Sequence, residues 1–182
     1  MPSTTAPAAL STLRVSKHLV PAHKRLPNSS ILNKPLLIYH SVFSNPSASA
    51  IESHLTSVGV VAPQWRYTMH PTSHFHSNTH EVLCVCSGSA RLCFGGEENP
   101  GRVEPVVQAG DVITLPAGVA HRLLDDTSRG SRFEMAGSYP KAYDWDMCYG
   151  REGEEGQVDG IGSVPWFDRD PIYGDQGPVL DA

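Results

Sequence analysis

Apolar residues in the central part of the chain form short runs, and each run is bounded by turn residues. The runs lie at 65–69, 81–86, 90–94, 103–107, 112–115 and 132–136, with Gly and Pro between them. A further apolar run lies at 36–39. Short strands at this spacing predict an all-β protein, built as an antiparallel sandwich or barrel. No internal repeat is found, so we expect a single barrel.

One segment before the barrel has the spacing of a helix instead. Within residues 46–58, Ile51, Leu55 and Val58 are separated by four and three positions, which places them on one helix face. Ser47 or Ser49 can cap the first turn, and Gly59 can end the last one. We expect this short helix to pack against the barrel.

These patterns divide a chain of 182 residues into one domain with extensions at both ends. Residues 1–13 are rich in Ala, Ser, Thr and Pro and are predicted to be a disordered tail. Residues 14–63 form an N-terminal extension with one strand and one helix, and residues 64–140 form the barrel. Residues 141–182 are expected to be loops that pack on the barrel through aromatic anchors.

Composition excludes several classes of protein. The net charge is −5 and the 14 basic residues form no stripe, so no nucleic-acid partner is expected. No apolar run approaches the roughly 20 residues that span a bilayer, so no membrane partner is expected either. The four cysteines do not have the spacing of a disulfide framework, and reduced thiols favour a cytoplasmic protein. A metal pair at Cys84 and Cys86 is an alternative, but no second cysteine pair with zinc-site spacing accompanies it.

The most informative stretch is His74-Phe75-His76 and the glutamate that follows it. In a strand, His74 and His76 point to the same side with their Cα atoms about 6.5 Å apart, so both imidazoles can converge on one ion. Glu81 begins the next strand, and His121 follows a tight turn at 116–118. Three imidazoles and one carboxylate predict a site for one divalent transition metal ion, either Fe, Mn, Zn or Ni.

Two motifs resemble those of the cupin superfamily. The first, HxH, four residues, Glu, six residues and Gly, matches at His74, His76, Glu81 and Gly88. The second, Gly, five residues, Pro, one residue, Gly, two residues and His, matches at Gly110, Pro116, Gly118 and His121. Thr68 and Asp125 depart from the motif ends, where Gly and Asn are usual. Neither of these two positions is a ligand.

A narrower resemblance covers most of the chain, including the strings "HFHSNTHEVL", "AGDVITLPAGVAH", "GSYP" and "DPIYGDQGP". It is to small single-domain cupins of bacteria and fungi, most of them uncharacterised. This resemblance implies a double-stranded β-helix, the cupin jelly-roll barrel, and a metal site. It implies no particular reaction.

Strand parity predicts which side chains face the cavity. If Glu81 points inward, Leu83 and Val85 do so as well, and Cys84 and Cys86 face away. His80 neighbours Glu81, so we expect it to support the ligands from behind, and it replaces Glu81 only if the turn bulges. The polar groups considered for substrate binding are Arg66, Tyr67, Arg91 and Arg132.

The resulting hypothesis is a metal-dependent enzyme that acts on a small organic molecule, with dioxygenase-type oxidoreductase chemistry preferred. A Lewis-acid isomerase, lyase or decarboxylase is the first alternative, and a non-catalytic metal-binding or ligand-binding module is the second. A metal-free epimerase with a histidine base is least favoured because the ligand set is intact. No catalytic residue is assigned. A homodimer is expected, with 35–43 as the strand that pairs between subunits.

Overall fold

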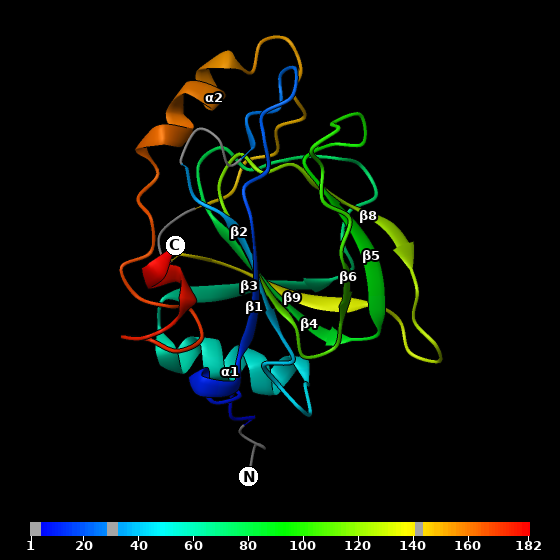
Figure 1. Ribbon diagram of the computed structural model, residues 1–182, viewed down its shortest axis with the longest axis vertical. Helices are drawn as coiled ribbons and strands as arrows, with labels where there is room; N and C mark the ends of the chain where they lie inside the picture. Colours follow the sequence, from blue (N-terminus) through cyan, green and yellow to red (C-terminus); the bar gives the residue numbers. More distant parts are fainter. Residues whose placement is uncertain (1–4, 29–32, 141–143) are drawn as a thin grey trace.

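The computed structural model describes residues 5–28, 33–140 and 144–182, in which nine strands form two antiparallel sheets (Figure 1). The larger sheet has the order β1-β2-β7-β4-β9-β3 and the smaller one the order β6-β5-β8. The strands are β1 Arg14–His18, β2 Leu36–His40, β3 Val61–Tyr67, β4 Glu81–Ser87, β5 Ser89–Phe94, β6 Val106–Gln108, β7 Val112–Leu115, β8 His121–Asp126 and β9 Glu134–Pro140. The predicted all-β jelly-roll class is confirmed.

Alternating residues of the large sheet supply two separate apolar cores. Leu83 and Val85 of β4 join an inner cluster that includes Leu92 and Phe94 of the smaller sheet. Their neighbours on β4 face the other side, where Cys84 belongs to an outer cluster. The parity prediction is therefore confirmed, and the thiols of Cys84 and Cys86 lie on the opposite face from the inner cavity.

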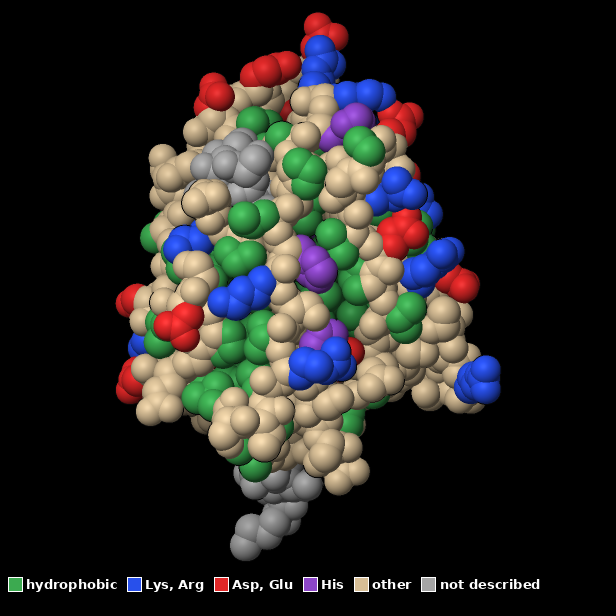
Figure 2. Space-filling model, in the orientation of Figure 1, with side chains coloured by type: hydrophobic (Ala, Val, Ile, Leu, Met, Phe, Trp, Pro, Cys, Tyr) green, Lys and Arg blue, Asp and Glu red, His purple; other side chains and the backbone are tan. Residues whose placement is uncertain are grey.

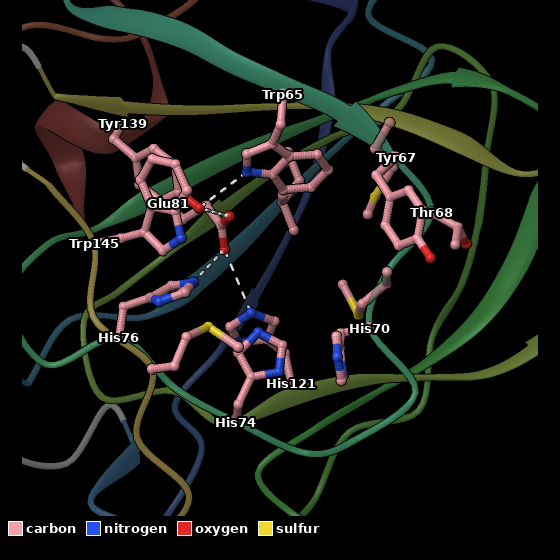
Figure 3. A pocket seen from close by; sticks show the side chains of 14 residues that line it. Trp65, Tyr67, Thr68, His70, His74, His76, Glu81, His121, Tyr139 and Trp145 are labelled. Atoms are coloured by element: carbon pink, nitrogen blue, oxygen red, sulfur yellow. Dashed lines mark hydrogen bonds and ion pairs between the residues drawn. The ribbon is translucent and has the colours of Figure 1, made fainter.

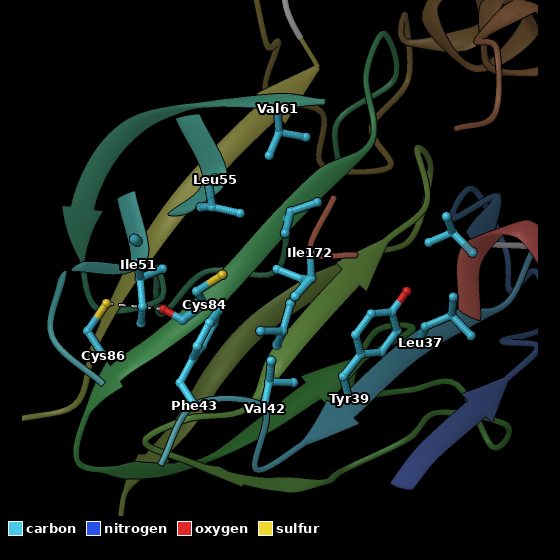
Figure 4. Packing of buried hydrophobic residues seen from close by; sticks show 14 of the residues in the cluster. Leu37, Tyr39, Val42, Phe43, Ile51, Leu55, Val61, Cys84, Cys86 and Ile172 are labelled. Carbon is cyan, nitrogen blue, oxygen red and sulfur yellow. Dashed lines mark hydrogen bonds between the residues drawn. The ribbon is translucent and has the colours of Figure 1, made fainter. Parts of the chain in front are cut away.

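Helix α1, Ala48–Val58, covers the outer face of the large sheet (Figures 1 and 4). Ser47 caps it by accepting a hydrogen bond from the backbone N–H of Ala50 at 3.3 Å, and Gly59 ends it in a left-handed conformation at φ 76°. Its apolar residues Ile51 and Leu55 are buried in the outer cluster. The helix predicted over 46–58 is confirmed.

The N-terminal segment is more ordered than its composition suggests. Residues 1–4 lie outside the described residues, but residues 5–13 carry a 3-10 turn at Leu10–Thr12, and the N–H of Ala8 bonds to the carbonyl of Val42 at 2.7 Å. The prediction of disorder is wrong for 5–13. Strand β1 follows, so the segment 14–63 holds two complete strands and the start of β3, where one strand was expected.

Strand β2 is paired on both sides, with β1 along one edge and β7 along the other. Residues 36–40 are therefore not an open sheet edge, because their backbone groups are already bonded within the chain, and edge-to-edge pairing of 35–43 between subunits is corrected. The homodimer itself stays a prediction. Among the predicted strands, 103–107 is reduced to a bridge at Val103 and the short β6, and β8 was not predicted.

The C-terminal segment winds back over the outer face (Figure 1). It contains helix α2, Glu155–Gly160, and 3-10 turns at Ile161–Ser163 and Pro178–Asp181. Phe167, Ile172 and Val179 are buried in the outer cluster. The carboxylate of Asp170, fully buried, accepts hydrogen bonds from the hydroxyl of Tyr39 at 2.8 Å and from three backbone N–H groups.

Charges on the face shown in Figure 2 alternate in sign along the edges of the molecule, with no continuous basic stripe on that face. In the described part of the chain, no helix has both the length and the apolar character needed to cross a membrane.

Candidate metal centre

The backbone of His74-Phe75-His76 explains why the two histidines share one side. His74 and His121 form a pair of mutual backbone hydrogen bonds, of 3.2 Å and 2.8 Å, which place the two side chains next to each other. Phe75 points the other way, into a small cluster with Cys148. In the extended segment His-Phe-His, the two histidines therefore face the cavity and the phenylalanine faces an apolar cluster.

The turn before His121 sets its position. Val119 donates its N–H to the carbonyl of Pro116 at 3.2 Å, and Gly118 has a φ of 88°, which glycine adopts without strain. The N–H of Gly118 bonds to the carbonyl of His76 at 2.8 Å. The turn thus ties the strand that carries His121 to the segment that carries His76.

Each of the three imidazoles is oriented by a backbone carbonyl behind it. The Nδ1 atoms of His74, His76 and His121 lie 2.9, 2.5 and 3.0 Å from the carbonyl oxygens of Thr72, Asp146 and Val119. A carbonyl oxygen only accepts, so each Nδ1 carries the proton and donates it. When these rings are neutral, their Nε2 atoms carry free lone pairs, which is the tautomer that a metal ion requires.

Glu81 completes this arrangement at the start of β4 (Figure 3). Its Oε2 is buried without a hydrogen-bond partner and lies 3.3 Å from Nε2 of His76 and 3.4 Å from Nε2 of His121. Burial alone would raise the pKa of this carboxyl, but the facing His76, whose own pKa is raised by Glu81, is the main cause that lowers the pKa of Glu81 to about 2. Burial lowers the pKa of His121 to about 3, so this ring is neutral.

These groups fit a metal ion. The ligand atoms of His74, His76 and His121 lie within 4.8 Å of one another, and all three side chains are buried. A carboxylate oxygen that is buried and unpartnered beside them would be costly without a cation. Three nitrogen donors and one oxygen donor suit a divalent transition metal better than calcium or magnesium.

The other oxygen of Glu81 is held by residues that sequence reasoning missed. The hydroxyl of Tyr139 donates to Oε1 of Glu81 at 2.7 Å, and the indole N–H of Trp65 donates to that hydroxyl at 3.0 Å. Trp65 packs directly on Gly137, where an added Cβ would lie 1.9 Å from the indole. The string Gly137-Ser138-Tyr139-Pro140 was the available signal for Tyr139. It was part of the family resemblance, but the sequence assigned it no function.

A second missed contribution comes from 144–148. The carboxylate of Asp146 accepts hydrogen bonds from the backbone N–H and the hydroxyl of Ser77. The backbone carbonyl of Asp146 accepts the hydrogen bond that orients His76. Trp145 stacks on Tyr139, with ring centroids 4.5 Å apart and planes 8° from parallel. This part of the C-terminal extension is therefore one wall of the site.

The ligand cluster lies at the base of a cavity of about 280 Å³. Of the four polar residues considered for substrate binding, only Tyr67 lines it. Arg66 is exposed and pairs with Glu52 of α1 at 2.6 Å, and Arg91 is exposed and lies 3.9 Å from Glu104. Arg132 is also exposed outside the cavity. These three expectations are corrected, because each arginine points outward from its strand or loop.

His80 lies behind the site, where its ring connects backbone groups of two other segments. Its Nδ1 accepts the backbone N–H of Ala117 at 2.9 Å and its Nε2 contacts the carbonyl of Pro165 at 3.0 Å. Burial lowers the pKa of His80 to about 4. Both ring nitrogens are thus engaged by backbone groups, which leaves neither available as the reserve ligand that the sequence allowed.

The fold and the three-histidine cluster define a small β-barrel protein of the metal-binding type. A family model described as "Cupin" matches residues 47–128. An uncharacterised protein of Bacillus subtilis (strain 168), YjlB, is 33% identical over 165 residues, which cover 90% of this chain and 93% of that protein. The chain belongs to the cupin family.

Solved structures with a similar fold include a deletion mutant of oxalate decarboxylase from Bacillus subtilis, at 20% identity and a TM-score of 0.38, and the 7S globulin of Momordica charantia, at 15% identity and a TM-score of 0.35. The matches cover 63% and 62% of this chain. They span only 28% and 26% of those proteins, which are much longer.

Proposed function

We propose that this cupin is a metal-dependent enzyme that oxidises a small organic molecule, with His74, His76, His121 and Glu81 as the metal ligands. The observation that carries the proposal is the set of three buried imidazoles whose ligand atoms lie within 4.8 Å of one another, beside the buried and unpartnered Oε2 of Glu81. A divalent ion bound there would supply open coordination positions for dioxygen and for a chelating substrate.

The remaining side chains support this role in two ways. The three carbonyls behind the imidazoles and the hydroxyl of Tyr139 fix the donors before any ion arrives, so little reorganisation accompanies binding. The wall above the donors includes Leu83 and Met135, which are apolar and exclude water from the reacting groups. A dioxygenase reaction places both oxygen atoms in the substrate and needs no separate reductant, which suits a site of this simplicity.

The test combines metal analysis with oxygen uptake. We expect the purified protein to hold close to one transition metal ion per chain and, once loaded with Fe(II), to consume oxygen in the presence of a turned-over substrate. His121→Ala should abolish both, and His18→Ala on β1 is the control that keeps the number of histidines equal.

Two results would redirect the proposal. Retention of Zn or Ni without oxygen chemistry, but with turnover that His121→Ala abolishes, would indicate a Lewis-acid isomerase, lyase or decarboxylase. Metal retention without turnover of any compound in a broad library would indicate a binding module. Failure to retain any metal would contradict the site itself.

A further inference from the structure

The walls of the cavity above the ligand cluster are apolar and aromatic. Apart from the four metal-facing residues, the lining consists of Trp65, Tyr67, Thr68, Met69, His70, Leu83, Met135, Tyr139, Trp145 and Met147. Not one of these described lining residues is Lys or Arg. A substrate that enters this cavity therefore meets flat rings and thioethers along its body, which favour an apolar or aromatic group.

The aromatic residues are arranged around the ligand cluster. In Figure 3, Tyr139 and Trp145 lie on one side of the histidines, and Tyr67 with Thr68 lies on the other. Trp65 closes the space between them, with its N–H turned toward Tyr139 and away from the open volume. A flat molecule can occupy this space with its faces against rings and one end directed at the histidines.

The mouth of the cavity is unusually apolar for a protein surface. Tyr67 is 61% exposed, Trp145 39% and Met147 38%, and all three line the cavity. Half of the large hydrophobic side chains that are exposed in the described chain thus gather at this one opening. Exposed apolar side chains around a cavity are typical of ligand-binding sites, because a ligand that covers them removes them from water.

Charge at the base of the cavity limits the anionic part of the ligand. A divalent ion bound by three neutral imidazoles and the carboxylate of Glu81 gives the site a formal charge of +1. A monoanionic chelating group neutralises it. A dicarboxylate would leave a net negative charge in a cavity whose described lining has no Lys or Arg, which is unfavourable in apolar surroundings.

We propose that the substrate is a monoanion with two oxygen atoms placed to chelate the metal and an aromatic or similarly flat apolar body. The cavity volume of about 280 Å³ suits a small molecule. This inference rests on the proposed metal site, and it excludes small dicarboxylates and other compounds that need cationic partners.

The test uses three probe compounds that separate the contribution of the chelating group (the head) from that of the apolar group (the body). Benzoylformate has an α-keto acid head and a phenyl body, pyruvate has the same head with a methyl group, and oxalate is a dianion with no body. Binding to the Zn(II)-loaded protein is measured by calorimetry and by quenching of tryptophan fluorescence. We expect benzoylformate to bind at least about tenfold tighter than pyruvate, from burial of the ring, and tighter than oxalate.

Variants at the mouth assign the preference to this cavity. Tyr67→Ala and Trp145→Ala should each weaken benzoylformate roughly three- to tenfold, the size of one aromatic contact, and leave pyruvate unchanged. Val106→Ala, with the same 61% exposure as Tyr67, and Leu180→Ala, at 41% exposure, are the matched controls outside the cavity. If Trp145→Ala disturbs the neighbouring Asp146, whose backbone carbonyl orients His76, the Tyr67→Ala variant still tests the cavity.

The outcomes distinguish this inference from the proposed function. If the protein retains its metal but pyruvate or oxalate binds as tightly as benzoylformate, the substrate class is overturned and the metal site stands. Equal losses of benzoylformate affinity in the cavity variants and in their controls would also overturn it. If the wild-type protein retains no metal, the proposed function fails, and the chelating head of the substrate fails with it.

Discussion

The hydrogen bond from Tyr139 to Glu81 offers the sharpest test of how the ligands are held. Tyr139→Phe deletes one hydroxyl that donates to Oε1 of Glu81 at 2.7 Å and accepts the indole N–H of Trp65 at 3.0 Å. The phenyl ring keeps its place in the sheet and its stack on Trp145. The substitution therefore changes the support of the carboxylate and removes no candidate metal ligand.

The magnitude follows from the charge on the acceptor. A buried hydrogen bond to a carboxylate contributes about 1.5–3 kcal/mol, and the indole N–H loses its acceptor as well. The free energy of unfolding should fall by about 2 kcal/mol. Metal affinity should fall roughly 10- to 100-fold, because Glu81 is no longer held in the orientation that directs Oε2 toward the histidines.

The chain supplies a matched control in Tyr39→Phe. Tyr39 is also buried and donates to a buried carboxylate, Asp170, at 2.8 Å, but on the outer face away from the cavity. We expect similar losses in the free energy of unfolding, measured by urea denaturation of the metal-free proteins. Only Tyr139→Phe should lose affinity for Zn(II) in competition with a chelator. Wild-type affinity in Tyr139→Phe, beside an equal loss of stability, would refute the positioning role.

Two further predictions concern packing and acid stability. Gly137→Ala should lower the free energy of unfolding by about 1–3 kcal/mol and shift the tryptophan emission, because the new Cβ displaces Trp65. Gly156→Ala, in open space on α2, is the control. Equal stability of the two variants would contradict this packing. Burial lowers the pKa of His80 from 6.5 to about 4, so the folded state resists a proton that the unfolded state accepts. Its contribution to stability is present above pH 6.5 and is lost as the pH falls toward 4. Between pH 6.5 and pH 4, the free energy of unfolding should therefore fall by about 3 kcal/mol less in His80→Gln than in the wild type. Denaturation curves with the same pH dependence in both proteins would contradict this prediction.

The local pattern of the chain was sufficient for the barrel, helix α1 and the candidate ligands. Apolar runs between Gly and Pro residues predict strands because burial of alternate side chains is a local property of a strand. Ser47 and Gly59 define the ends of α1 through bonds made within the helix itself. His74 and His76 share a side because the period of a strand is fixed, and the turn at Gly118 requires a residue that tolerates a positive φ.

Pairing with distant segments decided the parts that the sequence did not predict. Strands β1 and β8 are polar edge strands that take their regular structure from β2 and β5, so they carry no apolar run of their own. Arg66 and Tyr67 are adjacent, and only the position of α1 shows that Arg66 turns outward to Glu52.

The surroundings of the ligands depend on tertiary structure in the same way. Tyr139 and Asp146 lie 58 and 70 residues away from Glu81 and His76, the residues that they support. The identity of the candidate metal ligands is thus readable from motif spacing. The carbonyls, rings and hydroxyls that orient those side chains are brought together only when the sheet closes, because hydrogen bonds between distant residues leave no periodic trace in the sequence.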